Sequence, residues 1–287
     1  MNTQENNHRA HGGKRGINMD SFPSMKLCVL RGFLLVFIIN ISANCFAESV
    51  YTLDPTKDLI IASASLGLSV SSLFINHSAN TASKDGFPFP KGSVNTFDRS
   101  LMYEYNKTLD IASDFVLYGL MAMPLLSPLA GNIKDGNTWA MYGIMYAESI
   151  LLVFGTCELF KNSITRYRSY CYFGDVPSGK DADYYKSFPS RHTAFAFMSA
   201  GFLTSTFITE YPDSPWRIPL SIASYSLAAG VGAGRIFSGN HYISDVLAGA
   251  ALGSVYGYLI PWLHLRKTTD TVSLMPLFNG FMLVCKF

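Results

Sequence analysis

Residues 218–263, IPLSIASYSLAAGVGAGRIFSGNHYISDVLAGAALGSVYGYLIPWL, contain two apolar segments that are joined by a short polar junction. The segments cover residues 218–237 and 242–263, and each approaches the roughly 20 residues that a helix needs to cross a bilayer. Both are rich in Gly, Ala and Ser, which let neighbouring membrane helices pack closely. The junction contains an arginine, a histidine and an aspartate. Ionisable residues at the ends of membrane helices are costly to bury, so the junction is a candidate functional site.

Four more apolar segments lie upstream and cover residues 59–75, 111–130, 139–160 and 193–208. We therefore predict an all-α fold, a bundle of six membrane helices. Segment 59–75 is the weakest span, because its many serines make it marginal as a lipid-facing helix. A soluble, fully buried helical core is the alternative for segments of this length.

The composition also favours a membrane protein. Of the 287 residues, 49% are hydrophobic and only 15% are charged, whereas ordinary soluble domains carry about 25% charged residues. The mean hydropathy is +0.20. The net charge of +2 and the lack of a Lys/Arg-rich block argue against a nucleic-acid partner. The five cysteines are scattered and form no CxxC pair, so neither a disulfide framework nor a zinc site is indicated.

The two ends of the chain differ from this apolar core. Residues 1–24 are polar without periodicity and are predicted to be disordered. In residues 25–47, basic residues precede an apolar run and a small-residue site, which is the layout of a secretory signal peptide; an uncleaved membrane anchor is the alternative. The main domain is predicted to cover residues 58–265. In the tail, residues 266–287, an Asn-Gly pair between apolar runs predicts a short hairpin.

Three polar clusters lie at predicted helix ends: residues 161–170 after the third helix, 188–193 before the fourth, and 234–245 between the fifth and the sixth. If the helices alternate across the bilayer, these ends share one membrane surface. Four cations and two histidines then converge in a shallow pocket that suits a phosphate dianion. These residues are Lys161, Arg168, Arg191, His192, Arg235 and His241.

The residue types in these clusters favour phosphate binding and transfer. Arginine binds phosphate oxygens in bidentate fashion, and lysine adds a point charge. Ser190 lies just before a helix, whose free N–H groups and positive dipole end attract an anion. His241 and Asp245 are four residues apart and lie on one helix face, so the carboxylate can fix the imidazole tautomer for a nucleophile or a general base. His192 can then protonate the leaving oxygen.

No triplet of histidines and carboxylates with metal-binding spacing accompanies these residues, so we expect neither a metal nor another cofactor. A plainer interpretation treats the cations as snorkelling side chains at the membrane edge, one histidine as a helix cap and the other as a structural partner of its aspartate. Asp114, Glu148 and Glu158 are expected to make interhelical hydrogen bonds.

At these clusters the sequence resembles the phosphatidic acid phosphatase type 2 superfamily, which includes vanadium haloperoxidases and bacterial acid phosphatases. Its signature is Lys-x6-Arg-Pro, Pro-Ser-Gly-His and Ser-Arg-x5-His-x3-Asp, and the resemblance covers about residues 59–263 with the spacing of each part intact. Ser169, Arg191 and Gly234 stand where the family has proline, glycine and serine. The matching residues are Lys161 and Arg168, then Pro189, Ser190 and His192, then Arg235, His241 and Asp245.

The resemblance implies a metal-independent phosphatase that works through a phosphohistidine. In this family pattern His241 attacks phosphorus, Asp245 holds its ring, and His192 protonates the leaving group. The phosphate oxygens are bound by Lys161, Arg168, Ser190, Arg191 and Arg235. By analogy the substrate is a phosphomonoester or pyrophosphate of a membrane lipid, such as phosphatidic acid, phosphatidylglycerophosphate, undecaprenyl pyrophosphate or lipid A.

The secretory-type N-terminus indicates a protein of the bacterial cell envelope. The same resemblance implies an integral membrane protein whose site faces the periplasm and whose partners are the lipid substrate and the bilayer. The sequence indicates no oligomeric state. A periplasmic acid phosphatase for soluble phosphomonoesters and a vanadate-dependent haloperoxidase are alternatives within the family, although the latter are longer soluble enzymes. A non-catalytic phospholipid-binding or transport protein is the alternative from another class, but binding alone would not need two histidines and an aspartate.

Overall fold

The computed structural model describes residues 50–75, 77–130, 136–174, 176–266, 272–277 and 280–285. The predicted disordered extension, residues 1–24, and the predicted signal or anchor, residues 25–47, lie outside this described part of the chain.

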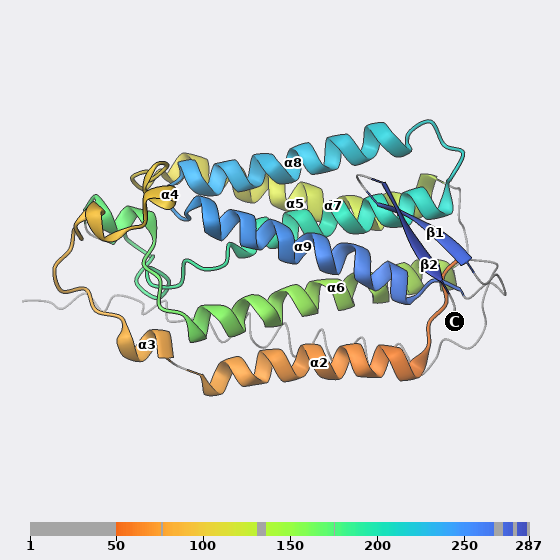
Figure 1. The fold of residues 1–287 in the computed structure, drawn as a ribbon, viewed down its shortest axis with the longest axis horizontal. Coiled ribbons are helices and arrows are strands. Elements are labelled where there is room, and N and C mark those ends of the chain that lie inside the picture. Colours follow the sequence, from red (N-terminus) through yellow and green to blue (C-terminus); the bar gives the residue numbers. More distant parts are fainter. Residues whose placement is uncertain are drawn as a thin grey trace, which may run out of the picture.

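Long antiparallel helices build an elongated bundle, in which successive helices alternate in direction (Figure 1). The described residues contain six such helices, as the apolar segments predicted. They are α2 (Pro55–Phe74), α5 (Lys107–Ala130), α6 (Gly136–Ser163), α7 (Arg191–Glu210), α8 (Arg217–Phe237) and α9 (Ile243–Leu263).

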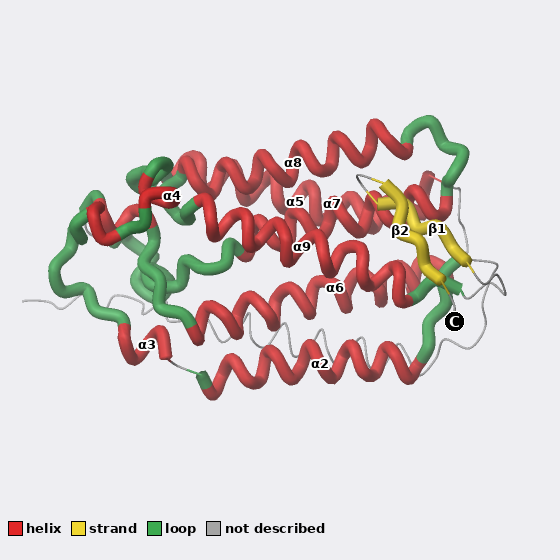
Figure 2. The backbone as a smooth tube through the Cα atoms, in the orientation of Figure 1, coloured by secondary structure: helices red, strands yellow, loops and turns green. Residues whose placement is uncertain are grey.

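The short helices lie at one end of the bundle and the two strands lie at the other (Figure 2). At the end where α2, α6 and α8 finish, loops surround four short helices. These are α3 (His77–Thr81), η1 (Lys91–Ser93), α4 (Thr96–Arg99) and η2 (Ser169–Tyr172). At the opposite end, β1 (Val272–Leu277) pairs antiparallel with β2 (Gly280–Cys285), which is the hairpin that the Asn-Gly pair predicted.

Helix α7 lies at the centre of the bundle and packs against α5, α6, α8 and α9. Three glycines of α9 allow its closest contact, because a Cβ atom at any of them would meet the backbone of α7. At Gly249 that atom would lie 2.5 Å from the carbonyl oxygen of Ser190, and at Gly253 it would lie 2.1 Å from that of Ala194. The contact brings the beginnings of the two helices together, where the Ser190 N–H donates to the carbonyl oxygen of Asp245 at 3.0 Å.

Four segments of the described chain are long and apolar enough to cross a membrane: Pro55–Thr81, Lys107–Leu125, Gly136–Ser163 and Ile243–Leu263. The first has the highest mean hydropathy of the four, 1.7, although its serines made it the weakest span expected from the sequence. Helices α7 and α8 are not among these segments of sufficient length and hydropathy. Helix α7 is nevertheless enclosed by the other helices of the bundle. The bundle is that of an integral membrane protein, since its outer helices expose large apolar side chains such as Ile60, Phe115 and Val255.

Candidate active site

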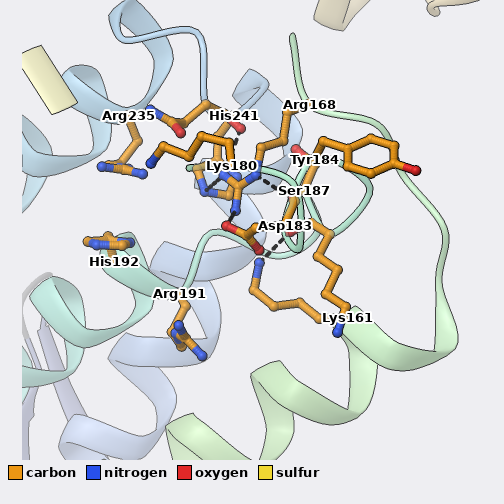
Figure 3. A network of polar contacts seen from close by, with 12 residues as sticks. Lys161, Arg168, Lys180, Asp183, Tyr184, Ser187, Arg191, His192, Arg235 and His241 are labelled. Carbon is orange, nitrogen blue, oxygen red and sulfur yellow. Dashed lines mark hydrogen bonds and ion pairs between the residues drawn. The ribbon is translucent and has the colours of Figure 1, made fainter. Parts of the chain in front are cut away.

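The three predicted clusters meet at the end of the bundle that carries α3 and α4 (Figure 1). Lys161 lies in the last turn of α6 and Arg235 in the last turn of α8, whereas Arg191 begins α7 and Asp245 lies in the first turn of α9. Residues 164–174 and 176–190 lie over this end and place Arg168 among these side chains (Figure 3).

The imidazole of His241 is 1% exposed and faces a guanidinium group. Its Nε2 lies 3.1 Å from Nη1 of Arg168, which also donates to the carbonyl oxygen of Asn240 at 3.1 Å. A guanidinium has only N–H donors, so Nε2 accepts this bond and the ring proton of the neutral imidazole lies on Nδ1. Burial lowers the pKa of His241 well below its ordinary value, and the positive charges of Arg168 and Lys161 lower it further. The free site therefore holds a neutral imidazole with a nucleophilic lone pair on Nε2.

The carboxylate of Asp245 faces His241 without a hydrogen bond between them. Its Oδ2 lies 3.5 Å from Nδ1 of His241, a nitrogen that has no hydrogen-bond partner among the described residues. Oδ2 instead accepts from the Ser187 hydroxyl at 2.5 Å and from the Tyr242 N–H at 3.0 Å. The predicted pair of His241 and Asp245 is therefore in place, but the two side chains have to approach by a few tenths of an ångström to form a hydrogen bond.

Arg166 links Asp245 to a residue that the sequence patterns did not single out. Its Nη1 donates to Oδ1 of Asp245 and its Nη2 to Oδ2 of Asp98, both at 2.5 Å. Asp98 also accepts from the N–H and the hydroxyl of Ser244, at 3.0 and 2.9 Å. Burial would raise the pKa of Asp98, but its hydrogen bonds and the Arg166 charge lower it below the ordinary value. Arg166 lies between the two motif cations in the sequence, whereas Asp98 lies in the short helix α4, which no sequence motif marked.

Arg235 and His192 are bound by carboxylates of α5. Arg235 forms an ion pair with Asp110, and its Nη1 lies 3.5 Å from Oδ1 of Asp114. The same Asp114 oxygen lies 3.0 Å from Nε2 of His192. Asp114 therefore does join helices, as expected, and in addition it contacts two of the predicted site residues.

Asp110 is a second residue of the site that no sequence motif marked. It accepts from Lys180 Nζ at 2.8 Å, from the Tyr105 hydroxyl at 2.9 Å and from the Asn240 amide at 3.1 Å, in addition to its ion pair with Arg235. No local pattern marks it, because its partners come from loops and from the far end of α8.

Arg191 departs from the role expected of its side chain. Its guanidinium pairs with Glu158 of α6 and lies over the ring of Phe154, away from His241 (Figure 3). What Arg191 retains for an anion is its backbone N–H in the first turn of α7. Ser190 caps this helix, with its hydroxyl oxygen 2.9 Å from that of Thr193. Lys161 is 4% exposed and donates to the carbonyl oxygen of Lys186 at 2.6 Å.

Ser169 and Gly234, which stand where the family motif has proline and serine, have local structural explanations. The Ser169 hydroxyl donates to the carbonyl oxygen of Tyr103 and accepts from its N–H, both at 3.0 Å, which ties the loop of Arg168 to the loop before α5. A Cβ atom at Gly234 would lie 2.9 Å from Cβ of Ser113, so α5 leaves no room there for a larger residue.

An anion already lies among the cations, because the carboxylate of Asp183 forms an ion pair with Arg168 (Figure 3). Partial burial would raise the pKa of Asp183, but the charges of Arg168 and Lys161 lower it to about 2. Its side chain is 47% exposed, whereas that of Arg168 is 4% exposed. The site thus attracts a negative group at a position that is reachable from outside, next to the neutral imidazole.

Comparisons with known proteins show which families and proteins this chain resembles. Residues 142–269 match the model of the family described as the PAP2 superfamily. A lipid A 1-phosphatase of Porphyromonas gingivalis is 34% identical over 146 residues, which are 49% of this chain and 29% of that protein. A probable diacylglycerol pyrophosphate phosphatase 1 of Schizosaccharomyces pombe is 29% identical over 83 residues, 27% of this chain and 30% of that protein.

The chain thus spans less than a third of the length of these curated relatives. Among solved structures, a transmembrane PAP2 type phosphatidylglycerolphosphate phosphatase from Bacillus subtilis is 20% identical, with a TM-score of 0.37 over 82% of this chain and 94% of that one. The region that matches the family model contains every predicted site residue from Lys161 to Asp245. Over residues 142–269 this chain is therefore similar to the PAP2 superfamily.

Proposed function

We propose that this protein is a membrane phosphatase that cleaves a lipid phosphate through a phosphohistidine on His241, and that residues 58–265 form its catalytic domain. The observation that carries the proposal is the neutral His241 Nε2, which is directed at Arg168 in a cationic site that now holds the Asp183 carboxylate. A phosphoryl group has the charge to replace that carboxylate and the electrophilic phosphorus for the imidazole to attack.

In the first step, phosphoryl oxygens take the place of Asp183 on Arg168, and Lys161 and Arg235 add positive charge around them. His241 Nε2 then attacks in line, so that a P–N bond forms while the P–O bond to the leaving group breaks. The imidazole becomes positively charged in this step, which draws its Nδ1 proton towards the Asp245 carboxylate and closes the 3.5 Å separation.

His192 acts on the leaving oxygen. His192 acts in its protonated form, which the Asp114 carboxylate 3.0 Å from Nε2 stabilises, and transfer of a proton from this imidazolium neutralises the departing alkoxide or phosphate. In the second step His192 accepts a proton from water, water oxygen attacks phosphorus, and the P–N bond breaks. Inorganic phosphate leaves and His241 is neutral again.

The surroundings of the site favour a substrate that is anchored in lipid. Exposed apolar side chains lie next to the site residues in the chain: Phe160 and Ile164 flank Lys161, and Phe237 follows Arg235. A phosphate group can reach Arg168 from this rim while its acyl chains remain in the bilayer. Both curated relatives are named for lipid phosphates or pyrophosphates, so we propose a lipid phosphomonoester or pyrophosphate as the substrate.

We further propose that the site faces the periplasm of a bacterial cell. Residue 50 lies at the bundle end opposite to the site, so this orientation puts it on the cytoplasmic side if α2 spans the membrane. Residues 25–47 would then be a retained anchor with its N-terminus outside. A Ser93→Cys variant at the end of η1, on the side of the site, should react with a membrane-impermeant maleimide in intact cells, and Asp213→Cys at the other end of the bundle should not. The reverse labelling would place the site in the cytoplasm.

Phosphate release from a panel of lipid phosphates, measured with purified protein in EDTA, tests the reaction class. His241→Ala should abolish both release and trapping of a radiolabelled phosphoenzyme, whereas the exposed His77→Ala serves as the control and should retain both. A phosphoenzyme that persists in His241→Ala would refute the nucleophile. Faster hydrolysis of a soluble phosphomonoester than of any lipid would favour the acid phosphatase instead.

A further inference from the structure

Three ionisable side chains from separate parts of the fold meet far from the phosphate site. Asp58 lies in the first turn of α2, Glu148 lies in α6, and His264 is the C-cap of α9. Asp58 and His264 belong to the bundle end opposite to Arg168 (Figure 1). Each of the three residues is at most 1% exposed, and one side-chain oxygen or nitrogen from each lies within 4.8 Å of the others.

Hydrogen bonding fixes the way in which His264 faces its neighbours. Its Nδ1 lies 2.9 Å from the carbonyl oxygen of Ile260, which can only accept, so Nδ1 carries a proton. Nε2 therefore points between the two carboxylates, 2.9 Å from Oδ1 of Asp58 and 3.5 Å from Oε2 of Glu148. A backbone carbonyl that holds the other ring nitrogen is the arrangement that orients metal-binding histidines.

The carboxylates of this group are not satisfied by the described part of the chain. Oδ2 of Asp58 and both oxygens of Glu148 are buried and have no hydrogen-bond partner there. A protonated His264 balances only one of the two negative charges, so the other carboxylate has to bind either a proton or a further cation. Burying an uncompensated charge is costly, whereas a divalent cation between two carboxylates and a neutral imidazole leaves a net charge of zero.

We propose that Asp58, Glu148 and His264 bind a divalent transition-metal ion, with Zn²⁺ as the best match. One imidazole and two carboxylates suit this borderline cation, which forms bonds of about 2.0–2.2 Å. Tetrahedral ligand atoms at that bond length lie about 3.4 Å apart, so the 3.5 Å separation between His264 and Glu148 already fits, and no pair has to approach by more than about 1.4 Å.

The ion would act as a structural clamp on α2. The chain before α2 already contacts the end of α9, since the Thr52 N–H donates to the carbonyl oxygen of His264 and the Arg266 N–H to that of Val50, both at 2.8 Å. The metal would add a bond from α2 to α6 and α9 at a depth that water does not reach. It takes no part in phosphoryl transfer, which occurs at the other end of the bundle.

Metal analysis of the purified full-length protein tests the clamp. The protein is expressed with added Zn²⁺, purified without chelator and analysed by mass spectrometry for metals. We expect about one equivalent of metal per chain, and a Tm that falls by about 5–10 °C when a strong chelator removes it. Glu148→Gln and His264→Gln should each lose at least about nine tenths of the metal, whereas Glu158→Gln on the same helix should keep it.

Two results would overturn the proposal. One is wild-type protein with less than about 0.1 equivalent of metal and a Tm that the chelator does not change, which would mean that the triad shares protons only. The other is a full equivalent of metal in Glu148→Gln and His264→Gln, which would place the ion elsewhere. If these variants do not fold, the visible absorption of Co²⁺ bound to the wild-type protein decides, because bands of a site with nitrogen and oxygen ligands are expected and bands of bare aqueous Co²⁺ refute the site.

Discussion

His241 and His264 lie at opposite ends of the helix bundle, each at most 1% exposed and each beside a carboxylate. Their surroundings have opposite charge. Nε2 of His241 faces the guanidinium of Arg168, whereas Nε2 of His264 faces the carboxylates of Asp58 and Glu148. An imidazole among cations stays neutral and leaves room for an anion, while an imidazole among carboxylates offers its lone pair to a cation. The charge around a buried histidine therefore decides which ligand it can serve.

The two regions also differ in their access to solvent. At the His241 end, the side chains of His192 and Arg191 are 28% and 25% exposed, and that of Asp183 is 47% exposed. All three members of the His264 triad are at most 1% exposed. Substrate has to enter and leave a catalytic site at every turnover, whereas a structural ion has to enter only once. The exposure at the His241 end fits the proposed exchange of phosphate, and the burial of the triad fits the retention of the proposed ion.

The largest expected effect separates the two histidines. His241→Ala should lower kcat by at least about 10³-fold, because it removes the nucleophile, while Tm should stay within a few degrees of wild type. His264→Ala should instead reduce the free energy of unfolding by about 3–5 kcal/mol, because it leaves buried carboxylates unpaired. Single-turnover kinetics and thermal unfolding in detergent measure the two. A comparable loss of kcat with no change in Tm for His264→Ala would remove the distinction between the two ends.

The next largest effect tests the guanidinium that faces His241. Arg168→Lys keeps the positive charge but loses the planar set of donors, so kcat/KM should fall by about 10²-fold. The matched control is Arg217→Lys at the other end of the bundle, where the arginine donates to the carbonyl oxygen of Pro212. Equal activity of Arg168→Lys and wild type would show that a point charge is sufficient.

A smaller effect should follow from removing the carboxylate that occupies the site. Asp183→Asn keeps the shape of the side chain but not its charge, so substrate phosphate no longer has to displace an anion from Arg168. We expect KM and the inhibition constant of inorganic phosphate to fall by about 3–10-fold. Asp181→Asn, two residues earlier and paired with the exposed Lys84, is the control. An increase in KM for Asp183→Asn would mean that Asp183 helps to bind substrate instead.

The smallest effect concerns pH. Because the pKa of His241 lies well below its ordinary value in the free protein, the nucleophile is neutral at and above pH 6.5 and stays so some way below it. The acid limb of kcat/KM, which reports the free enzyme and the free substrate, should therefore follow the second ionisation of the substrate phosphate alone. Titration of that substrate by phosphorus NMR supplies the reference curve. A further enzyme limb near pH 6.5 would contradict the cationic setting of His241.

Much of this site could be predicted because its parts are local in the sequence. The apolar runs predicted where the helices begin and end, and the four-residue spacing of His241 and Asp245 predicted that they face each other, as they do at 3.5 Å. Side-chain partners could not be predicted in this way. The turn of Arg191 towards Glu158 depends on how α6 and α7 pack, and the approach of Asp183 to Arg168 depends on the path of the loop between them.

By itself, the sequence determined the six helices, the end of the bundle at which the cations gather, and the three-part motif, because apolar length and residue spacing act along the chain. Only the tertiary structure decided which anion occupies the cations, that Arg166 joins Asp245 to Asp98, and that Asp58, Glu148 and His264 meet. Those contacts join residues up to about two hundred positions apart, and their energies depend on distance and burial, which exist only once the helices have packed.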